Sequence, residues 1–340
     1  MKFKKSFSLA IFLAMFCASA SSAVLLEEIT PKPFSDKDVN LTASLVEFAD
    51  PVEESDAFGV KGAVWKDGRL YMLHQEGNLD CYVLEGDFLV RDPKAFGGKG
   101  TVKLDKSMEC LQMDDQGWFY ASASSYQDLY IVEPDGTVHK MKDGKTNMGK
   151  LWVHPSGEWG VRVSGKPSRL ADLVKAKAGE AEFSAEMANL STKKGALSTS
   201  FDRFTYFKIN ADGSCFVSGS SPKVKGQGYW GVLDKDYKEV FAFLEKPQSK
   251  DPRCIGSVTE IITCKQGYAV LDGNLRRLHF YGKDFAHITT ADLRALLGLN
   301  YCWPSAAVRI DDDTVLVVCT QDFPKGSKCA ESLVMKVKGL

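Results

Sequence analysis

The chain has 340 residues, with 43 Lys and Arg against 44 Asp and Glu, which gives a formal net charge of −1. This balance argues against a dedicated nucleic-acid-binding protein, which is normally strongly basic, so we expect no nucleic-acid partner. The hydrophobic share of 44% suits a globular core and excludes wholesale disorder.

Residues 1–23 have the pattern of a cleaved signal peptide. A mostly apolar run over 7–20 follows a basic head, and small residues come after it up to Ala23. The apolar run is shorter than the roughly 20 residues that a membrane-spanning helix needs, although an uncleaved anchor is the alternative. We therefore expect an exported protein, periplasmic or extracellular, with no membrane span after signal cleavage.

After an N-terminal extension at 24–40, the most regular feature is a turn that ends in Gly, once in Asp, just ahead of an apolar strand. It recurs at Asp67-Gly68, Gln116-Gly117, Ser156-Gly157, Asp212-Gly213, Gln266-Gly267 and Asp312-Asp313. The intervals are 49, 40, 56, 54 and 46 residues. Such a period is typical of an array of small sheets.

Short β-rich runs lie between tight turns with Gly, Asp and Pro, and four such runs complete a repeat. The first two repeats have expected strands at 60–65, 69–74, 79–84 and 88–91, then at 108–113, 118–123, 128–132 and 137–141. The fourth and fifth have them at 204–209, 214–218, 229–233 and 239–244, then at 258–263, 268–271, 275–281 and, weakly, 285–288.

The sixth repeat lacks one strand, because only 306–310, 314–319 and 332–337 precede the end of the chain. The β-like run at 41–48 lies before the first repeat and can supply the missing strand by pairing with 332–337. This pairing would close a ring and remove an exposed edge. We therefore predict an all-β fold over 41–340, a six-bladed β-propeller closed by an N-terminal strand, with small helical insertions.

This rhythm of blades resembles the six-bladed β-propellers of the NHL, YWTD and TolB-like kind. The resemblance covers residues 41–340 and concerns the fold alone, since no YWTD motif occurs. It implies the architecture and no particular activity, because one fold hosts many functions.

Two segments depart from the strand pattern. The stretch 167–190 is rich in Ala, Glu, Lys and Leu and is expected to form one or two helices. Residues Thr289 to Asp292 look like a capping box that opens a short helix through Leu297. Packing against the edge of the fold is the favoured role of both, and a lid is the alternative.

Motifs of known catalytic chemistry are missing from the sequence. It contains no G-x-S-x-G, no H-E-x-x-H and no G-x-x-x-x-G-K-[ST]. The five histidines are scattered, and Asp311-Asp312-Asp313 lacks the spacing of a calcium loop and sits where a hairpin turn belongs. We expect no metal and no cofactor, and whether the chain is an enzyme stays open.

In a propeller, the connections from the second to the third strand and between repeats lie on one face, which we call the loop face. The tight turns lie on the other, the turn face. Lysines gather in the expected loop-face segments and aspartates in the turns, although solubility and turn chemistry explain both as well. A basic mouth would attract anions. The candidate ligand-binding residues are Lys150, Trp152, Lys223, Lys225, Trp303 and Lys325.

The favoured function is thus an exported β-propeller binding protein whose ligand at the basic loop face is anionic. That ligand could be a glycan, a small metabolite or a protein surface. A hydrolase or lyase with a site at the channel mouth is one alternative. An envelope assembly scaffold is another.

Eight cysteines remain once Cys17 leaves with the signal peptide, an even number that favours disulfides in an exported protein. Cys254 and Cys264 flank one strand that spans roughly 33 Å when extended, so they are not expected to pair. Strand positions suggest four bridges: Cys81–Cys110, Cys215–Cys264, Cys254–Cys302 and Cys319–Cys329. The alternative is that several are small buried residues that stay reduced.

Overall fold

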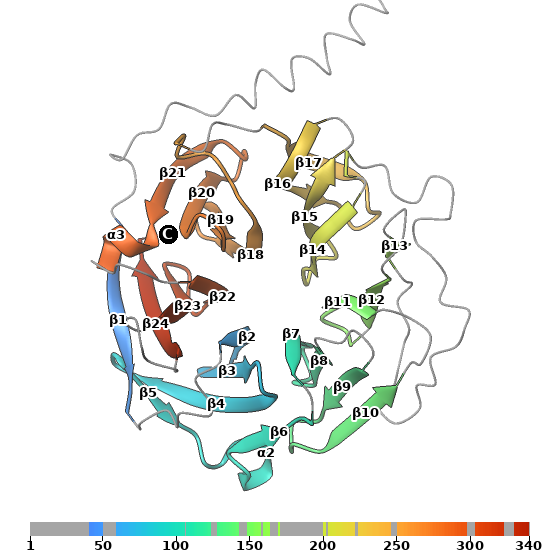
Figure 1. Ribbon diagram of the computed structural model, residues 1–340, viewed down its shortest axis with the longest axis vertical. Coiled ribbons are helices and arrows are strands. Elements are labelled where there is room, and N and C mark those ends of the chain that lie inside the picture. Colours follow the sequence, from blue (N-terminus) through green and yellow to red (C-terminus); the bar gives the residue numbers. More distant parts are fainter. Residues whose placement is uncertain are drawn as a thin grey trace, which may run out of the picture.

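The computed structural model describes residues 41–49, 59–105, 107–123, 128–142, 148–157, 159–163, 169–170, 200–201, 203–221, 224–245, 250–297, 303–322 and 330–339. These residues are nearly all in β-strands, which form sheets of nine, four, three, four and four strands. Figure 1 shows the sheets standing around a common centre in chain order, a β-propeller-like arrangement.

The nine-stranded sheet joins the two ends of the described chain. Its strands are β1 (Thr42–Phe48), β2 (Val60–Lys66), β3 (Arg69–His74), β4 (Asn78–Glu85), β5 (Phe88–Arg91), β6 (Thr101–Lys103), β22 (Trp303–Arg309), β23 (Thr314–Asp322) and β24 (Ala330–Lys338). Strand β1 pairs antiparallel with β24, with Thr42 opposite Lys338, and parallel with β5. The expected pairing of 41–48 with 332–337 is therefore present.

The other four sheets follow one another along the chain. The second contains β7 (Met108–Met113), β8 (Phe119–Ala123), β9 (Asp128–Val132) and β10 (Val138–Lys142), and the third β11 (Met148–Val153), β12 (Trp159–Val163) and β13 (Arg169–Leu170). The fourth contains β14 (Arg203–Ile209), β15 (Cys215–Ser221), β16 (Val224–Leu233) and β17 (Glu239–Phe243), and the fifth β18 (Val258–Cys264), β19 (Gly267–Asp272), β20 (Arg277–Gly282) and β21 (His287–Asp292).

The repeated turns explain why the strands fold back on themselves. Five of their glycines have positive φ, a conformation that costs glycine little: Gly68, Gly117, Gly157, Gly213 and Gly267. Within these turns the Gly117 amide donates to the Asp114 carbonyl at 3.1 Å, and the Gly213 amide donates to the Asn210 carbonyl at 2.9 Å. The turn signal in the sequence therefore reports a real constraint on the backbone.

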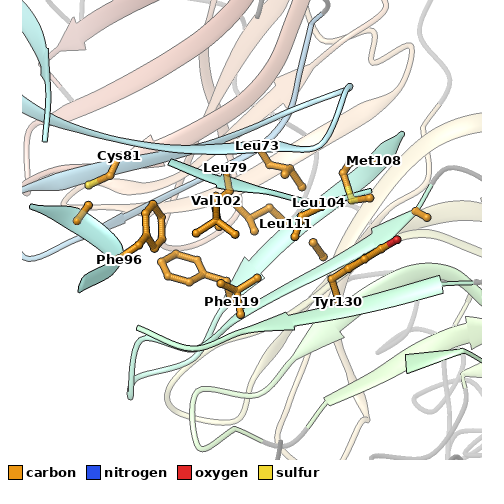
Figure 2. Close-up of a cluster of buried hydrophobic side chains, with 14 residues drawn as sticks. Leu73, Leu79, Cys81, Phe96, Val102, Leu104, Met108, Leu111, Phe119 and Tyr130 are labelled. Carbon is orange, nitrogen blue, oxygen red and sulfur yellow. The ribbon is translucent and has the colours of Figure 1, made fainter. Parts of the chain in front are cut away.

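Apolar side chains fill the spaces between neighbouring sheets. Figure 2 shows one such cluster, in which Leu73 and Leu79 from the first repeat pack with Phe119 and Tyr130 from the second. Each of these four side chains is at most 2% exposed, and burial of a large apolar side chain contributes about 1.5–3 kcal/mol. The two sheets approach closely at Gly62 of β2, where a Cβ atom would lie 2.7 Å from the Leu111 backbone nitrogen.

The two described helices are short, and the expected start of one of them is wrong. Helix α2 (Ala95–Gly98) lies before β6, and α3 (Leu293–Leu297) follows β21. Asp292 Oδ1 accepts hydrogen bonds from the amides of Arg294 at 3.0 Å and Ala295 at 3.3 Å. The helix therefore begins after Asp292, because the preceding residues, including Thr289, pair with β20. In the expected helical stretch 167–190, Arg169–Leu170 form a strand and the remaining residues lie outside those described.

Two of the four expected disulfides are not formed in the structure. Cys81, Cys110, Cys215 and Cys264 carry free thiols. Cys81, Cys215 and Cys264 are buried, and burial raises the pKa of the first two to about 12 and that of the third to about 11. The pairs Cys81–Cys110 and Cys215–Cys264 are thus absent from the structure. Cys302 and Cys329 lie outside the described residues, so the other two pairs stay predictions.

Candidate functional site

A cavity of about 790 Å³ occupies the centre of the arrangement. Its walls come from β2, β7, β11, β14, β18 and β22, the first strand of each repeat. Each of these strands contacts the next, and β22 contacts β2, so they form a closed ring around the centre (Figure 1). The volume lies within the range of sites that bind small molecules, roughly 300–1,000 Å³.

The same irregularity occurs in all six of these first strands. Each gains one residue relative to its partner strand near its start, between Val60/Gly62, Met108/Cys110, Met148/Leu151, Phe204/Tyr206, Val258/Glu260 and Pro304/Ala306. This is the signature of a β-bulge, which re-aims a side chain and is common next to active sites. The bulges lie at the loop-face end of the strands, so they surround one mouth of the cavity.

The extra residues of five bulges are polar. We call these residues the mouth ring: Lys61, Glu109, Thr205, Thr259 and Ser305. All five are half-buried, and all but Thr205 line the cavity. Lys150 lies within the sixth bulge, in β11, and its side chain is outside those described. The mouth thus presents a cation, a carboxylate and hydroxyl groups at one level.

Toward the turn face the cavity meets a second one, of about 460 Å³. Lys208 and Glu260 line both cavities and therefore lie where the two meet. Glu260 Oε1 accepts hydrogen bonds from the Tyr206 hydroxyl at 2.6 Å and from Lys208 Nζ at 2.8 Å. Burial, and then the charge of Glu260, raise the pKa of Tyr206 well above its usual value. This carboxylate is thus already held by two donors.

Charged groups at the turn-face mouth are also engaged locally. Lys66 Nζ donates to the backbone oxygens of Asp114 and Asp115, and Arg309 pairs with Asp312. Asp114 is 4% exposed, and its carboxylate accepts hydrogen bonds from the backbone amides of Gln116 at 2.9 Å and Trp118 at 3.0 Å. Aspartates here serve the turns, as the turn-chemistry interpretation expects.

Of the six candidate ligand-binding residues, Trp303 is the one whose side chain is described. It opens β22 on the loop face and is 38% exposed. The Arg276 guanidinium lies 4.2 Å from the centre of its ring, a cation–π contact. Lys150 and Trp152 belong to β11 and Lys225 to β16, while Lys223 and Lys325 lie outside the described residues.

The sequence interpretation missed the mouth ring, although a signal for it exists. Once the repeats are aligned on their turns, Glu109, Thr205, Thr259 and Ser305 each stand eight residues before Gly117, Gly213, Gly267 and Asp313 respectively. Lys61 stands seven before Gly68. A polar residue recurring at one place in an otherwise apolar strand would have indicated a shared level around the centre.

The described residues hold no group of three His, Cys, Asp or Glu side chains placed to bind a metal ion. In the same part of the chain, no helix has the length and apolar character needed to cross a membrane.

Comparison with known proteins gives no family. No protein-family model matches the chain, and no curated protein matches it. Among solved structures, virginiamycin B lyase from Staphylococcus aureus aligns at 8% identity and a TM-score of 0.47, over 89% of this chain and 100% of that one. A catalytically inactive form of this lyase with quinupristin aligns at 9% identity and a TM-score of 0.49, over 88% of this chain and 100% of that one. YCF48 bound to the D1 peptide aligns at 10% identity and a TM-score of 0.44, over 82% of this chain and 77% of that one. These values carry no conclusion about what this chain binds or does.

Proposed function

We propose that the chain is an exported, six-bladed β-propeller that binds an anionic ligand at the loop-face mouth of its central cavity. The six first strands with six equivalent bulges support the blade count. On this view the nine-stranded sheet is two blades joined where β1 meets β5, and β1 closes the ring by completing the last blade. The signal-peptide pattern of residues 1–23 supports the proposed location.

The observation that carries the proposal is the ring of bulges around the mouth. It gathers polar residues from five bulges at one end of a cavity large enough for a small molecule or the end of a chain, and four of them line that cavity. Lys61 supplies a cation there, and Arg276 and Trp303 lie on the same face. A basic rim with an aromatic ring suits a carboxylate attached to a sugar or another flat group.

Binding is favoured over catalysis because the carboxylate deeper in the cavity is already held by neighbouring donors. An enzyme at this place would need convergent ionisable groups that are available to a substrate. Among the described residues, Glu260 deeper in the cavity is instead held by Tyr206 and Lys208. Lys61 and Glu109 of the mouth ring line the cavity without such partners among the described residues, which suits recognition.

A charge-reversal experiment tests the proposal. The triple variant Lys150→Glu, Lys223→Glu and Lys325→Glu, on the expected loop face, should lose retention on immobilised polygalacturonate. The matched control reverses three exposed turn-face lysines, Lys235, Lys238 and Lys283, with the same change in net charge. Retention of the wild type should weaken with salt, because exposed charges are screened beyond about 10 Å at 0.1 M salt. Equal loss in both variants, or salt-independent retention, would contradict it.

A further inference from the structure

The mouth ring places opposite charges on neighbouring strands. Lys61 is the extra residue of the bulge in β2, and Glu109 is the extra residue of the bulge in β7. Strands β2 and β7 are in contact, and the two residues occupy equivalent positions at the same end of their strands. Both side chains are half-buried and line the cavity of about 790 Å³.

Neither charge is compensated within the part of the chain that the structure describes. Lys61 and Glu109 form no ion pair with each other, and neither has a side-chain hydrogen bond to another described residue. This contrasts with Lys208 and Glu260 deeper in the cavity, which bind each other at 2.8 Å. Each half-buried charge is partly cut off from water, so a ligand group of opposite sign would gain a charge-assisted hydrogen bond at each of them.

The rest of the ring is uncharged where it is described. Thr259 of β18 and Ser305 of β22 line the same cavity with hydroxyl groups, and the Ser305 hydroxyl donates to the Val318 carbonyl at 3.2 Å. Hydroxyls both donate and accept, so they suit the amide groups of a ligand that carries charges at its ends. A ligand that bears negative charge alone would satisfy Lys61 and leave Glu109 without a partner.

We propose that the mouth ring recognises a small zwitterion, a molecule with a carboxylate for Lys61 and an ammonium group for Glu109, such as a short peptide with free termini. This inference rests on the proposed function, because it names the ligand class of the same site. It adds a role for Glu109 that anion binding does not require.

Three glycine peptides separate the two charges. Isothermal titration calorimetry would compare triglycine, which carries both charges, with two blocked forms. N-acetyl-triglycine keeps only the carboxylate, and triglycinamide keeps only the ammonium group. Diglycine and tetraglycine vary the distance between the two charges. The zwitterionic peptide of best length should bind more tightly than either blocked form by about tenfold or more, the value of one charge-assisted hydrogen bond.

Variants assign each charge to its residue. Lys61→Met should weaken binding of triglycine and N-acetyl-triglycine, and Glu109→Gln should weaken binding of triglycine and triglycinamide, each by about tenfold or more. The matched controls, Lys235→Met and Glu85→Gln, remove the same charges from exposed turn-face positions and should bind as the wild type does. Thermal unfolding confirms that each variant is folded before titration.

The possible failures are distinguishable. If N-acetyl-triglycine binds as tightly as triglycine and Glu109→Gln changes neither, the zwitterion proposal is overturned while an anion site remains. If no glycine peptide binds but polygalacturonate still retains the protein through the loop face, the zwitterion proposal again fails alone. If polygalacturonate retention is also insensitive to the loop-face reversal, the proposed function fails with it.

Discussion

Lowering the pH from about 7 to about 5 is expected to destabilise the native state through His287, which is 1% exposed. Burial is the main reason that the pKa of His287 falls from its ordinary 6.5 to about 4. The charges of His279 and Arg253 lower it further, and Asp251 acts in the opposite direction. The native state therefore keeps this imidazole neutral at a pH where the unfolded chain binds a proton.

The magnitude follows from the two pKa values. One pKa unit is worth about 1.4 kcal/mol, so the fall from 6.5 to about 4 limits the effect to about 3 kcal/mol. The contribution of His287 to the free energy of unfolding is fully present above the pKa that it has in the unfolded chain. It is lost as the pH falls below that pKa, so about 2 kcal/mol is lost by about pH 5. Burial also lowers the pKa of His279, against the influence of Asp272, so that residue acts in the same direction.

The assay is urea unfolding followed by tryptophan fluorescence at several pH values, for the wild type and His287→Gln. Glutamine keeps a polar group near the Thr290 hydroxyl, which lies 2.8 Å from His287 Nε2, but cannot titrate. The variant should be less stable at neutral pH because it loses the edge contact with the Tyr281 ring, at 5.3 Å. Its free energy of unfolding should nevertheless fall by about 2 kcal/mol less than that of the wild type between the two pH values. Equal falls would refute the reasoning.

Three further predictions concern the scaffold. Gly62→Ala should destabilise the protein by about 1–3 kcal/mol in chemical denaturation, because its Cβ would meet Leu111 at 2.7 Å; an unchanged midpoint would show that the strands separate freely. Deleting 24–50 removes β1 and should sharply lower the melting temperature, since both of its partner strands become edges; an unchanged melting temperature would contradict the proposed role of β1 in closure. Tyr206→Phe should cost about 1 kcal/mol by removing the hydroxyl that donates to Glu260, and a neutral result would show that this hydrogen bond contributes nothing.

Local sequence signals predicted the strands well because the turns impose them. Residues 60–65 and 69–74 were expected around the turn at Gly68, and the strands run Val60–Lys66 and Arg69–His74. The positive φ of that glycine is a local requirement that a short stretch of sequence reveals. The pairing of 41–48 with the last strand could be predicted because the sixth repeat lacks one strand and an extra β-like run precedes the first repeat.

Features set by the neighbouring strand could not be predicted in the same way. A bulge exists only relative to the partner strand, so the pattern around Lys61 or Glu109 looks like an ordinary strand start. Thr289 illustrates the same point, because its capping-box pattern is overruled by pairing with β20. The pairing of Cys81 with Cys110 was inferred from a shared face, but the direction of each thiol depends on packing that sequence spacing does not encode.

The most direct test of the central claim is to locate the bound anion. Lysines would be reductively methylated with and without a saturating oligogalacturonate, and the modified residues mapped by mass spectrometry. An anion at the loop-face mouth should protect Lys61 and Lys150, while Lys235 and Lys283 on the turn face are modified equally in both samples. Protection of the turn-face lysines, or unchanged modification of Lys61 and Lys150 when the ligand is bound, would contradict the account.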